Sequence, residues 1–139
     1  MQAVPYLGFK DQCRAAFEFY HQVLGGDLVA MATMGDMPGP DEVAEEMKHL
    51  IMHARLISGG VTLMGSDDCG GMYQKPQGIS VAFGVEEPAE ADRIFAAFAE
   101  GGEVIMPIQE TFWAVRFGML TDRFGTPWMI NCEKCQNPA

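Results

Sequence analysis

The chain has 139 residues, 48% of them hydrophobic and 20% charged, which is enough apolar surface for one folded domain with its own core. Nine basic and 19 acidic residues give a formal net charge of -10. This balance argues against binding to nucleic acid or to an anionic membrane surface, because both need clustered Lys and Arg. The sequence predicts no signal peptide, no membrane-spanning helix and no disulfide framework among the four cysteines. A cytoplasmic protein is therefore predicted.

The first half of the chain is predicted to fold as a strand, a helix and three further strands. Apolar residues at helical spacing predict a helix over 13–24. Alternating or β-prone runs predict strands over 3–9, 28–33, about 50–57 and about 60–66, with a hairpin turn at Ser58-Gly59-Gly60. Residues 35–40 are rich in Gly and Pro and predict a loop, followed by an acidic turn or short helix to about residue 48.

The second half predicts the same order. A strand is expected over 79–85, followed by a helix over 88–100 that has Pro in its first turn, where the missing N–H is harmless. The remaining strands are expected over about 103–109, 114–121 and 127–133. The polar segment at about 67–77 separates the halves. We therefore expect a single domain, 1–139, with module one at about 1–67, a linker at about 67–77 and module two at about 78–135.

The two halves also share a sequence pattern. Phe19 and Gly25-Gly26-Asp27-Leu28-Val29 return as Phe95 and Gly101-Gly102-Glu103-Val104-Ile105, each displaced by 76 residues. In both copies a helix ends at a glycine, whose left-handed conformation closes the helix, and an apolar strand follows at once. The pattern predicts a pseudo-symmetric α+β domain of two βαβββ modules, with any binding site between the halves. Coincidence is the alternative, since Gly-Gly after a helix is common.

The order of elements, together with several short strings, resembles the vicinal-oxygen-chelate superfamily, and more closely its PhnB-like branch. The superfamily includes glyoxalase I, the bleomycin- and fosfomycin-resistance proteins and extradiol dioxygenases. The strings that carry the resemblance are Pro5-Tyr6-Leu7-Gly8-Phe9, Gly35-Asp36-Met37-Pro38, His53-Ala54-Arg55, Met64-Gly65-Ser66-Asp67, Gln109-Glu110-Thr111-Phe112-Trp113-Ala114 and Pro127-Trp128-Met129-Ile130-Asn131. The resemblance implies two curled mixed sheets around a cavity, with the helices on the outer face, and a homodimer.

The superfamily takes its metal ligands from the first and fourth strands of each module. By resemblance these positions fall on Pro5, Met64, Ser80 and Met129. None carries the imidazole or carboxylate that a catalytic divalent ion needs. We therefore expect the fold without the metal site, and no cofactor.

The candidate ligand-cavity residues are polar, aromatic or Met side chains on the predicted strands and their connections: His53, Met64, Ser80, Glu110, Phe112, Trp113, Arg116 and Met129. His53 suits acid–base work or anion binding, with a hydrogen-bonded structural histidine as the alternative. Trp113 suits a pocket or dimer interface, and Arg116 could pair with a carboxylate or phosphate, or with Glu110 at the surface. Strand alternation places Met129 on the cavity side and Trp128 in the sheet–helix core.

The cysteines and Ser80 lack the surroundings of a nucleophile. The Cys132-x-x-Cys135 pair follows a strand, not a helix N-terminus, and a zinc site would need two more ligands, for instance across a dimer. The leading hypothesis is a protein that binds a small molecule, with a physiological role that the sequence does not name. The alternative is a metal-assisted or acid–base lyase or isomerase that uses His53 and Glu110, and the sequence leaves open whether the protein is an enzyme.

Overall fold

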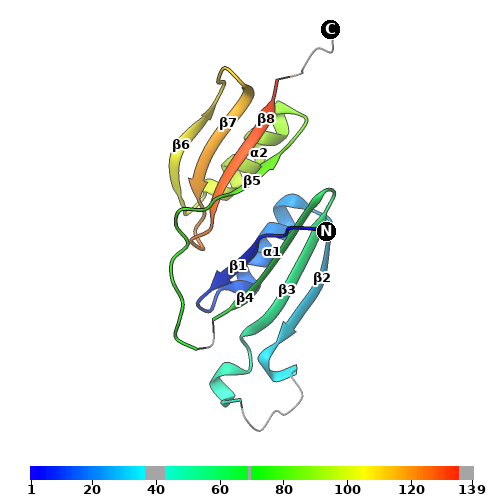
Figure 1. Ribbon diagram of the computed structural model, residues 1–139, viewed down its shortest axis with the longest axis vertical. Helices are drawn as coiled ribbons and strands as arrows, with labels where there is room; N and C mark the ends of the chain where they lie inside the picture. The colour runs from blue at the N-terminus through cyan, green and yellow to red at the C-terminus, as the bar shows by residue number, and fades with distance from the viewer. Residues whose placement is uncertain (37–42, 69, 135–139) are drawn as a thin grey trace. The chain divides into compact units, whose positions relative to one another are not determined.

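The computed structural model describes residues 1–36, 43–68 and 70–134 (Figure 1). The chain forms two compact units, Met1–Lys75 and Pro76–Ala139. Each unit packs one helix on one four-stranded mixed sheet, so the predicted α+β fold of two βαβββ modules is confirmed. The organisation as a single domain stays a prediction.

The first unit contains β1 (Tyr6–Phe9), α1 (Cys13–Leu24), β2 (Asp27–Thr33), β3 (Ile51–Ser58) and β4 (Val61–Asp67). Two short 3-10 helices, η1 (Met34–Asp36) and η3 (Glu45–Met47), lie in the connection between β2 and β3. The strand order is β1-β4-β3-β2, in which β1 is parallel to β4 and the other neighbours are antiparallel. The long connection that the parallel neighbours β1 and β4 need runs through α1, β2 and β3.

The second unit repeats this topology with β5 (Val81–Gly84), α2 (Pro88–Ala99), β6 (Glu103–Gln109), β7 (Ala114–Thr121) and β8 (Pro127–Glu133). Its strand order is β5-β8-β7-β6, and again only the first pair is parallel. Pro88 begins α2, as predicted from its missing N–H.

The paired glycines after the two helices have the same structural role in both units. Gly25 and Gly101 have positive φ of 76° and 74°, which residues with a side chain rarely adopt. Gly25 ends α1 with ψ of -156°, outside the left-handed helical region that the sequence predicts. A Cβ at Gly26 would lie 2.2 Å from the carbonyl oxygen of Ile57, and one at Gly102 would lie 2.3 Å from that of Thr121. The second glycine of each pair is thus required by close approach to the neighbouring strand, which explains why the Gly-Gly string recurs.

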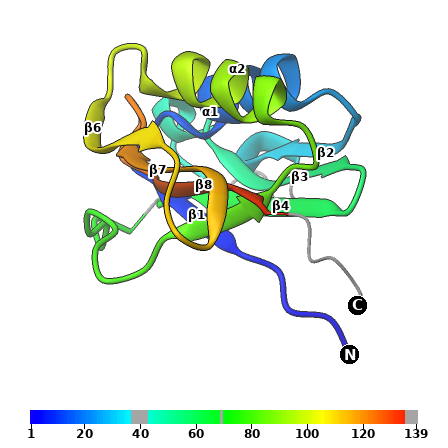
Figure 2. The same ribbon diagram turned by 90° about the horizontal axis from the view of Figure 1, so that it is seen from above.

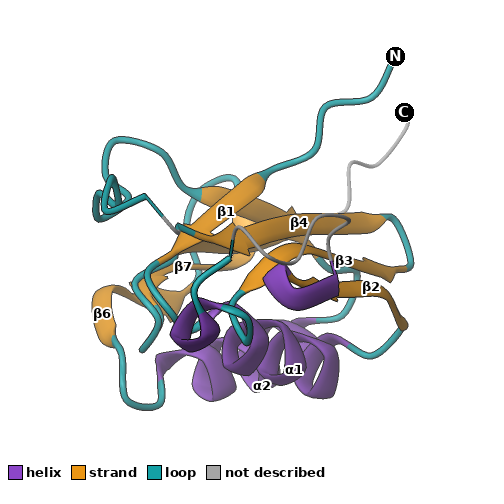
Figure 3. Cartoon of the chain, turned by 90° about the horizontal axis from the view of Figure 1, so that it is seen from below, coloured by secondary structure: helices purple, strands orange, loops and turns teal. Residues whose placement is uncertain are grey.

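Each helix covers one face of its own sheet (Figures 2 and 3). In the first unit Phe17 of α1 packs edge-on against Phe9 of β1, with ring centroids 6.2 Å apart. In the second unit Phe98 of α2 packs against Trp128 of β8 at 4.8 Å. Trp128 is fully buried, as predicted from strand alternation. These two apolar layers form the cores.

Most predicted elements agree with the structure within two residues. The exception is the start of β1, which begins at Tyr6, three residues after the predicted residue 3, while β5 begins at Val81, two residues after the predicted residue 79. Ile79 is 78% exposed and so contributes no packing that would extend β5. The predicted loop at 35–40 lies mostly outside the described residues. No helix in the described parts of the chain has the length and apolar character needed to cross a bilayer.

Candidate functional site

The face of each sheet that does not carry its own helix, here called the helix-free face, holds most of the chemically interesting side chains. Alternation along β4 buries Leu63 and Gly65 under α1 and leaves Met64 and Ser66 half-buried on the helix-free face. On β1 the same alternation exposes Tyr6 and buries Leu7. The helix-free face is therefore built by every second residue of the strands.

One row of residues crosses the helix-free face of the first sheet. Tyr6 of β1 pairs with Met64 of β4, which pairs with Arg55 of β3, which pairs with Ala30 of β2. His53 lies two residues before Arg55 on the same strand and hence on the same face. The Tyr6 hydroxyl lies 3.3 Å from His53 Nδ1, and the two rings are stacked with centroids 6.0 Å apart. Tyr6, His53 and Arg55 thus form a polar cluster on this face.

The corresponding row of the second sheet is apolar. Ala82 of β5 pairs with Met129 of β8, which pairs with Met119 of β7, which pairs with Met106 of β6. All three methionines are half-buried. Unbranched, polarisable Met side chains adapt to ligands of varied shape. This methionine row extends the prediction for Met129 to two further residues.

The connection between β6 and β7 carries three predicted site residues. Glu110 is exposed, Phe112 is 88% exposed and Trp113 is 43% exposed. Trp113 packs edge-on against Phe112 and against Phe117 of β7, with centroids 4.8 and 5.3 Å apart. Phe117 pairs with Asn131 and lies on the helix-free face, so Trp113 adjoins that face at the end of the sheet.

Arg116 lies on the opposite, helix-covered side of β7. Its Nε is 3.0 Å from Asp92 Oδ1 of α2, an ion pair in which the N–H is not aligned for a hydrogen bond. The structure therefore does not bring Arg116 together with Met119 and Met129. The pair with Asp92 also differs from the surface pair with Glu110 that the sequence left open.

The four positions that resemblance marks as metal ligands do not offer a suitable donor set. Met64 is held beside Pro5 by a hydrogen bond from its N–H to the Pro5 carbonyl oxygen, 3.1 Å. Met129 lies beside Ala82, and Ser80 precedes β5. Pro has no side-chain donor, and thioethers bind hard divalent ions poorly. Within residues 1–36, 43–68 and 70–134, no three His, Cys, Asp or Glu side chains are grouped closely enough to hold a metal ion.

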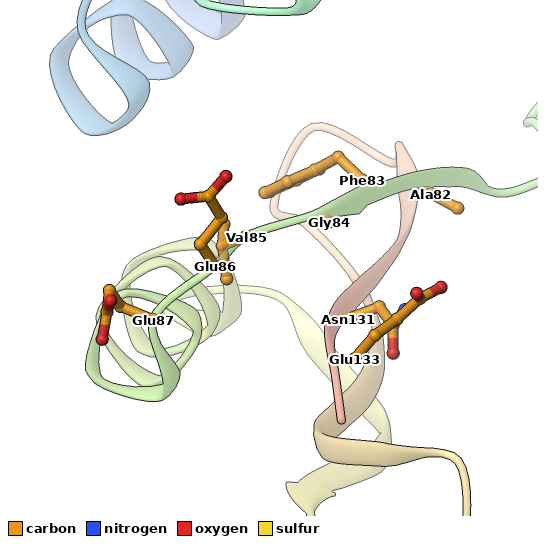
Figure 4. A pocket seen from close by; sticks show the side chains of 8 residues that line it. All are labelled: Ala82, Phe83, Gly84, Val85, Glu86, Glu87, Asn131 and Glu133. Atoms are coloured by element: carbon orange, nitrogen blue, oxygen red, sulfur yellow. The ribbon is translucent and has the colours of Figure 1, made fainter. Parts of the chain in front are cut away.

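A shallow hollow of about 650 Å³ lies where β5 leads into α2 (Figure 4). Asn131 and Glu133 project from the same side of β8, and Glu86 and Glu87 lie at the start of the helix (Figure 4). Asn131 Oδ1 is buried and accepts no hydrogen bond from any described residue. The lining is acidic, which favours a donor-rich or cationic group over an anion there.

A second hollow, about 530 Å³, lies in the first unit and includes His49, Lys10, Asp11 and Asp68 in its lining. His49 lies in the turn before β3 and lines this hollow, whereas His53 lies on β3. His21 Nε2 lies 3.0 Å from the carbonyl oxygen of Gly26, so this side chain contacts the backbone just after the end of α1.

The described cysteines are not set up as nucleophiles. Burial raises the pKa of the Cys13 thiol to about 12, and the adjacent Asp67 carboxylate acts in the same direction. Cys132 is also buried, with Sγ 3.5 Å from the carbonyl oxygen of Glu86. Cys69 and Cys135 lie outside the described residues, and so does the Cys132-x-x-Cys135 pair as a whole.

Two carboxyl groups have perturbed acidities with local causes. A hydrogen bond from the Thr33 N–H lowers the pKa of exposed Asp36. The Arg93 guanidinium lowers the pKa of Glu90 through a hydrogen bond, with Nε 3.0 Å from Glu90 Oε2. Both arrangements are exposed and support turn and helix structure, so neither marks a catalytic group.

Tyr6 and Arg55 are site candidates that the sequence patterns do not single out, whereas strand alternation predicts Asn131 on the same face as Met129. Arg55 stands two residues after His53, and this spacing on a strand was the available signal. Tyr6 required knowledge that β1 and β4 are neighbours in the sheet, which strand patterns do not supply.

Comparison with known proteins identifies relatives over nearly the whole chain. Residues 6–130 match the model of the Glyoxalase/Bleomycin resistance protein/Dioxygenase superfamily. Protein YjdN of Escherichia coli strain K12 is 34% identical over 144 residues, covering 98% of each chain. The crystal structure of protein PA1353 from Pseudomonas aeruginosa is 51% identical, with a TM-score of 0.89 over 97% of this chain and 99% of that one.

A more distant structure shares the fold. It is described as a putative 3-demethylubiquinone-9 3-methyltransferase, PhnB protein, from Bacillus cereus, and it is 22% identical with a TM-score of 0.77 over 95% of this chain and 99% of that one. The repeated βαβββ topology and the match over residues 6–130 agree with each other. The chain therefore belongs to the Glyoxalase/Bleomycin resistance protein/Dioxygenase superfamily.

Proposed function

We propose that the protein binds a small molecule on the helix-free faces of its sheets and does so without a tightly held metal ion. The observation that carries the proposal is the methionine row Met129, Met119 and Met106 on one sheet, together with the row of Tyr6, Met64 and Arg55 on the other. Side chains of this kind combine adaptable apolar surface with a few polar groups, which is the usual composition of a ligand site.

Four of the predicted cavity residues support this proposal by their position. His53 and Met64 lie on the first helix-free face, Met129 lies on the second, and Trp113 adjoins the second through Phe117. Ser80, Glu110 and Phe112 remain predicted ligand contacts. Arg116 is the weakest candidate because Asp92 already pairs with it.

The methionines make the proposal testable at the level of single residues. A thermal-shift screen of metabolites and antibiotics would supply ligands, since a compound at 100 times its dissociation constant adds about 2.7 kcal/mol of stability. Each ligand would then be titrated into protein labelled with 13C at the methionine methyl groups. We expect the methyl signals of Met64, Met119 and Met129 to shift. Met72, which is 81% exposed in the segment after β4, is the internal control and should not shift.

Binding should persist after treatment with a chelator. Ligands that shift only Met72, or a screen without any stabilising compound, would contradict the proposed binding function. Stoichiometric metal in the purified protein, lost in His53→Ala, would contradict the part of the proposal that concerns metal.

A second candidate function is acid–base catalysis as a lyase or isomerase. The contact between the Tyr6 hydroxyl and His53 Nδ1 favours it, because a positioned hydroxyl can hold the imidazole in one orientation. Product formation from a ligand found in the screen, lost in His53→Ala while binding remains, would establish it. Homodimer formation and a cytoplasmic location remain predictions.

A further inference from the structure

We propose that the helix-free face of the first sheet holds an oxyanion group of the ligand, a carboxylate or a phosphate-type group, through Arg55 with Tyr6 and His53. The inference rests on the proposed small-molecule function and names the chemistry that this face recognises. It concerns residues that the metal-ligand positions of the superfamily do not include.

The three residues lie on the same face of the first sheet. Arg55 and His53 both come from β3, an inner strand, and Tyr6 comes from β1 at the edge. Tyr6 stands in the same row as Arg55, two strand spacings or roughly 10 Å away across the backbone. Its hydroxyl nevertheless reaches His53, so the Tyr6 ring leans across β4 toward β3. Three potential hydrogen-bond donors are thereby gathered over Met64 and its neighbours.

Arg55 lacks a counter-charge among the described residues. Its Nε is buried and has no hydrogen-bond partner, and no ion pair joins it to a described carboxylate. By contrast, Arg93 and Arg116 pair with acids of α2. A buried donor left without an acceptor costs about 1–3 kcal/mol, and more when it is charged. The protein has 19 acidic and nine basic residues. A guanidinium without an acidic partner on a sheet face would therefore attract anions to that face of an otherwise acidic protein.

The residues next to Arg55 on the helix-free face are uncharged or basic: Tyr6, Ala30, His53 and Met64. One acid of these strands, Asp27, lies further along the same face; it is exposed and pairs with Ile57, two residues from Arg55 on β3. An anion placed beside Arg55 therefore meets positive charge and a hydroxyl group first. A metal cation or an ammonium group would be repelled by Arg55.

Comparison of the two sheets argues that the fold does not require this arginine. Arg55 pairs with Met64, and the equivalent position of the second sheet is Met119, which pairs with Met129. The duplicated fold therefore forms equally well with an apolar side chain at this place. An uncompensated charge at a position that accepts methionine is better explained by a ligand than by packing.

The chemistry of the cluster fits an oxyanion. A guanidinium presents paired N–H groups that match two oxygens of a carboxylate or phosphate, and such bonds are about twice as strong as neutral ones. The Tyr6–His53 pair supplies one more donor while its own contact is kept: the imidazole Nε2–H if the hydroxyl donates to Nδ1, or the Tyr6 O–H if Nδ1–H donates to the hydroxyl. Both anion classes share this pattern, so the test must compare them.

The test follows the Arg55 Nε–H signal by NMR during titration of the full chain with sodium acetate, sodium phosphate or sodium methylphosphonate. Sodium chloride at matched ionic strength is the control for screening. We expect saturable shifts of Arg55 and of the Tyr6 ring with at least one oxyanion, and the order of affinities will identify the preferred class. Arg55→Gln should weaken binding at least tenfold, and Tyr6→Phe by a smaller factor. Arg93→Gln, which removes a helix-surface arginine, should leave binding unchanged.

Three results would overturn the inference. They are the absence of saturable shifts in the wild-type chain, equal shifts with chloride, and unchanged affinity in Arg55→Gln. If Arg55→Gln does not fold, Arg55→Lys provides the second variant, because it keeps the charge but loses the paired geometry and should also bind more weakly. Ligands from the thermal-shift screen separate the two proposals. Equal binding of those ligands to wild type and Arg55→Gln would reject the oxyanion site while leaving small-molecule binding intact.

Discussion

At the scale of single residues, one carboxylate organises the turn between β7 and β8. Asp122 is 3% exposed, and its Oδ1 accepts hydrogen bonds from the N–H groups of Phe124 and Thr126 at 2.9 and 3.0 Å. Its Oδ2 accepts from the indole Nε1 of Trp128 at 2.8 Å. The carboxylate therefore ties the turn to the buried tryptophan of the second core.

Asp122→Ala should lower the free energy of unfolding by about 3 kcal/mol, because it leaves at least two buried donors unsatisfied at about 1–3 kcal/mol each. Urea unfolding followed by tryptophan fluorescence measures this effect, since both tryptophans, Trp113 and Trp128, lie in the second unit. Asp92→Ala is the matched control. It removes a half-exposed partner of Arg116 and should change the stability by less than about 1 kcal/mol. Equal effects of the two substitutions would refute this role of Asp122.

At the scale of elements, each helix approaches its sheet where a strand residue has no side chain. A Cβ at Gly65 of β4 would lie 2.7 Å from the Phe17 ring of α1, and one at Gly118 of β7 would lie 2.6 Å from the Phe95 ring of α2. The same arrangement, an aromatic ring of the helix over a strand glycine, therefore occurs in both units, on β4 in the first and on β7 in the second. The distance between helix and sheet is set by an aromatic ring that lies over a glycine.

Gly118→Ala should therefore destabilise the second unit by about 1–3 kcal/mol, the usual effect of overpacking a core. A Cβ there also comes within 3.0 Å of the Ile108 backbone, so a change of the Phe95 rotamer alone cannot relieve the clash. Gly84→Ala is the control, because its nearest contact, the Asn131 carbonyl oxygen at 3.6 Å, is an ordinary van der Waals distance. Thermal unfolding by circular dichroism would compare them, and a stable Gly118→Ala protein would count against this packing argument.

The elements were largely predictable from the sequence, whereas the candidate site was predictable only in part. Helical periodicity located α1 at Cys13–Leu24, and the terminal Gly-Gly pairs located the repeat, because both signals are local. The Tyr6, His53 and Arg55 cluster depends on strand order, which joins residues 47 positions apart in the case of Tyr6 and His53. Arg116 was assigned by type alone; its face follows from alternation with buried Gly118 and Leu120, which places it on the helix-covered side of β7.

At the scale of the whole molecule, the two compact units are joined through an extended segment. Residues 70–80 form no helix or strand, and Met72 and Ile79 near its ends are 81% and 78% exposed. The boundary between the units, Lys75 and Pro76, lies within it. Backbone that is exposed and outside regular elements is the preferred place for proteolytic cleavage, because a protease must bind an extended chain.

Limited proteolysis of the native protein should therefore cut this segment first. Chymotrypsin is expected to cleave after Met72 or Tyr73, and thermolysin before Met72 or Ile79, in each case yielding two fragments that mass spectrometry can identify. Phe112 is an internal control, since it is 88% exposed but lies in a tight turn closed by hydrogen bonds between Thr111 and Ala114. Cleavage after Phe112 should be slower. Because each unit has its own helix, sheet and aromatic core, the nicked protein should keep its helical circular dichroism signal. Initial cleavage at Phe112 would contradict the preference for this segment. Loss of the circular dichroism signal on cutting the segment would show that the two units do not hold their structure without an intact connection.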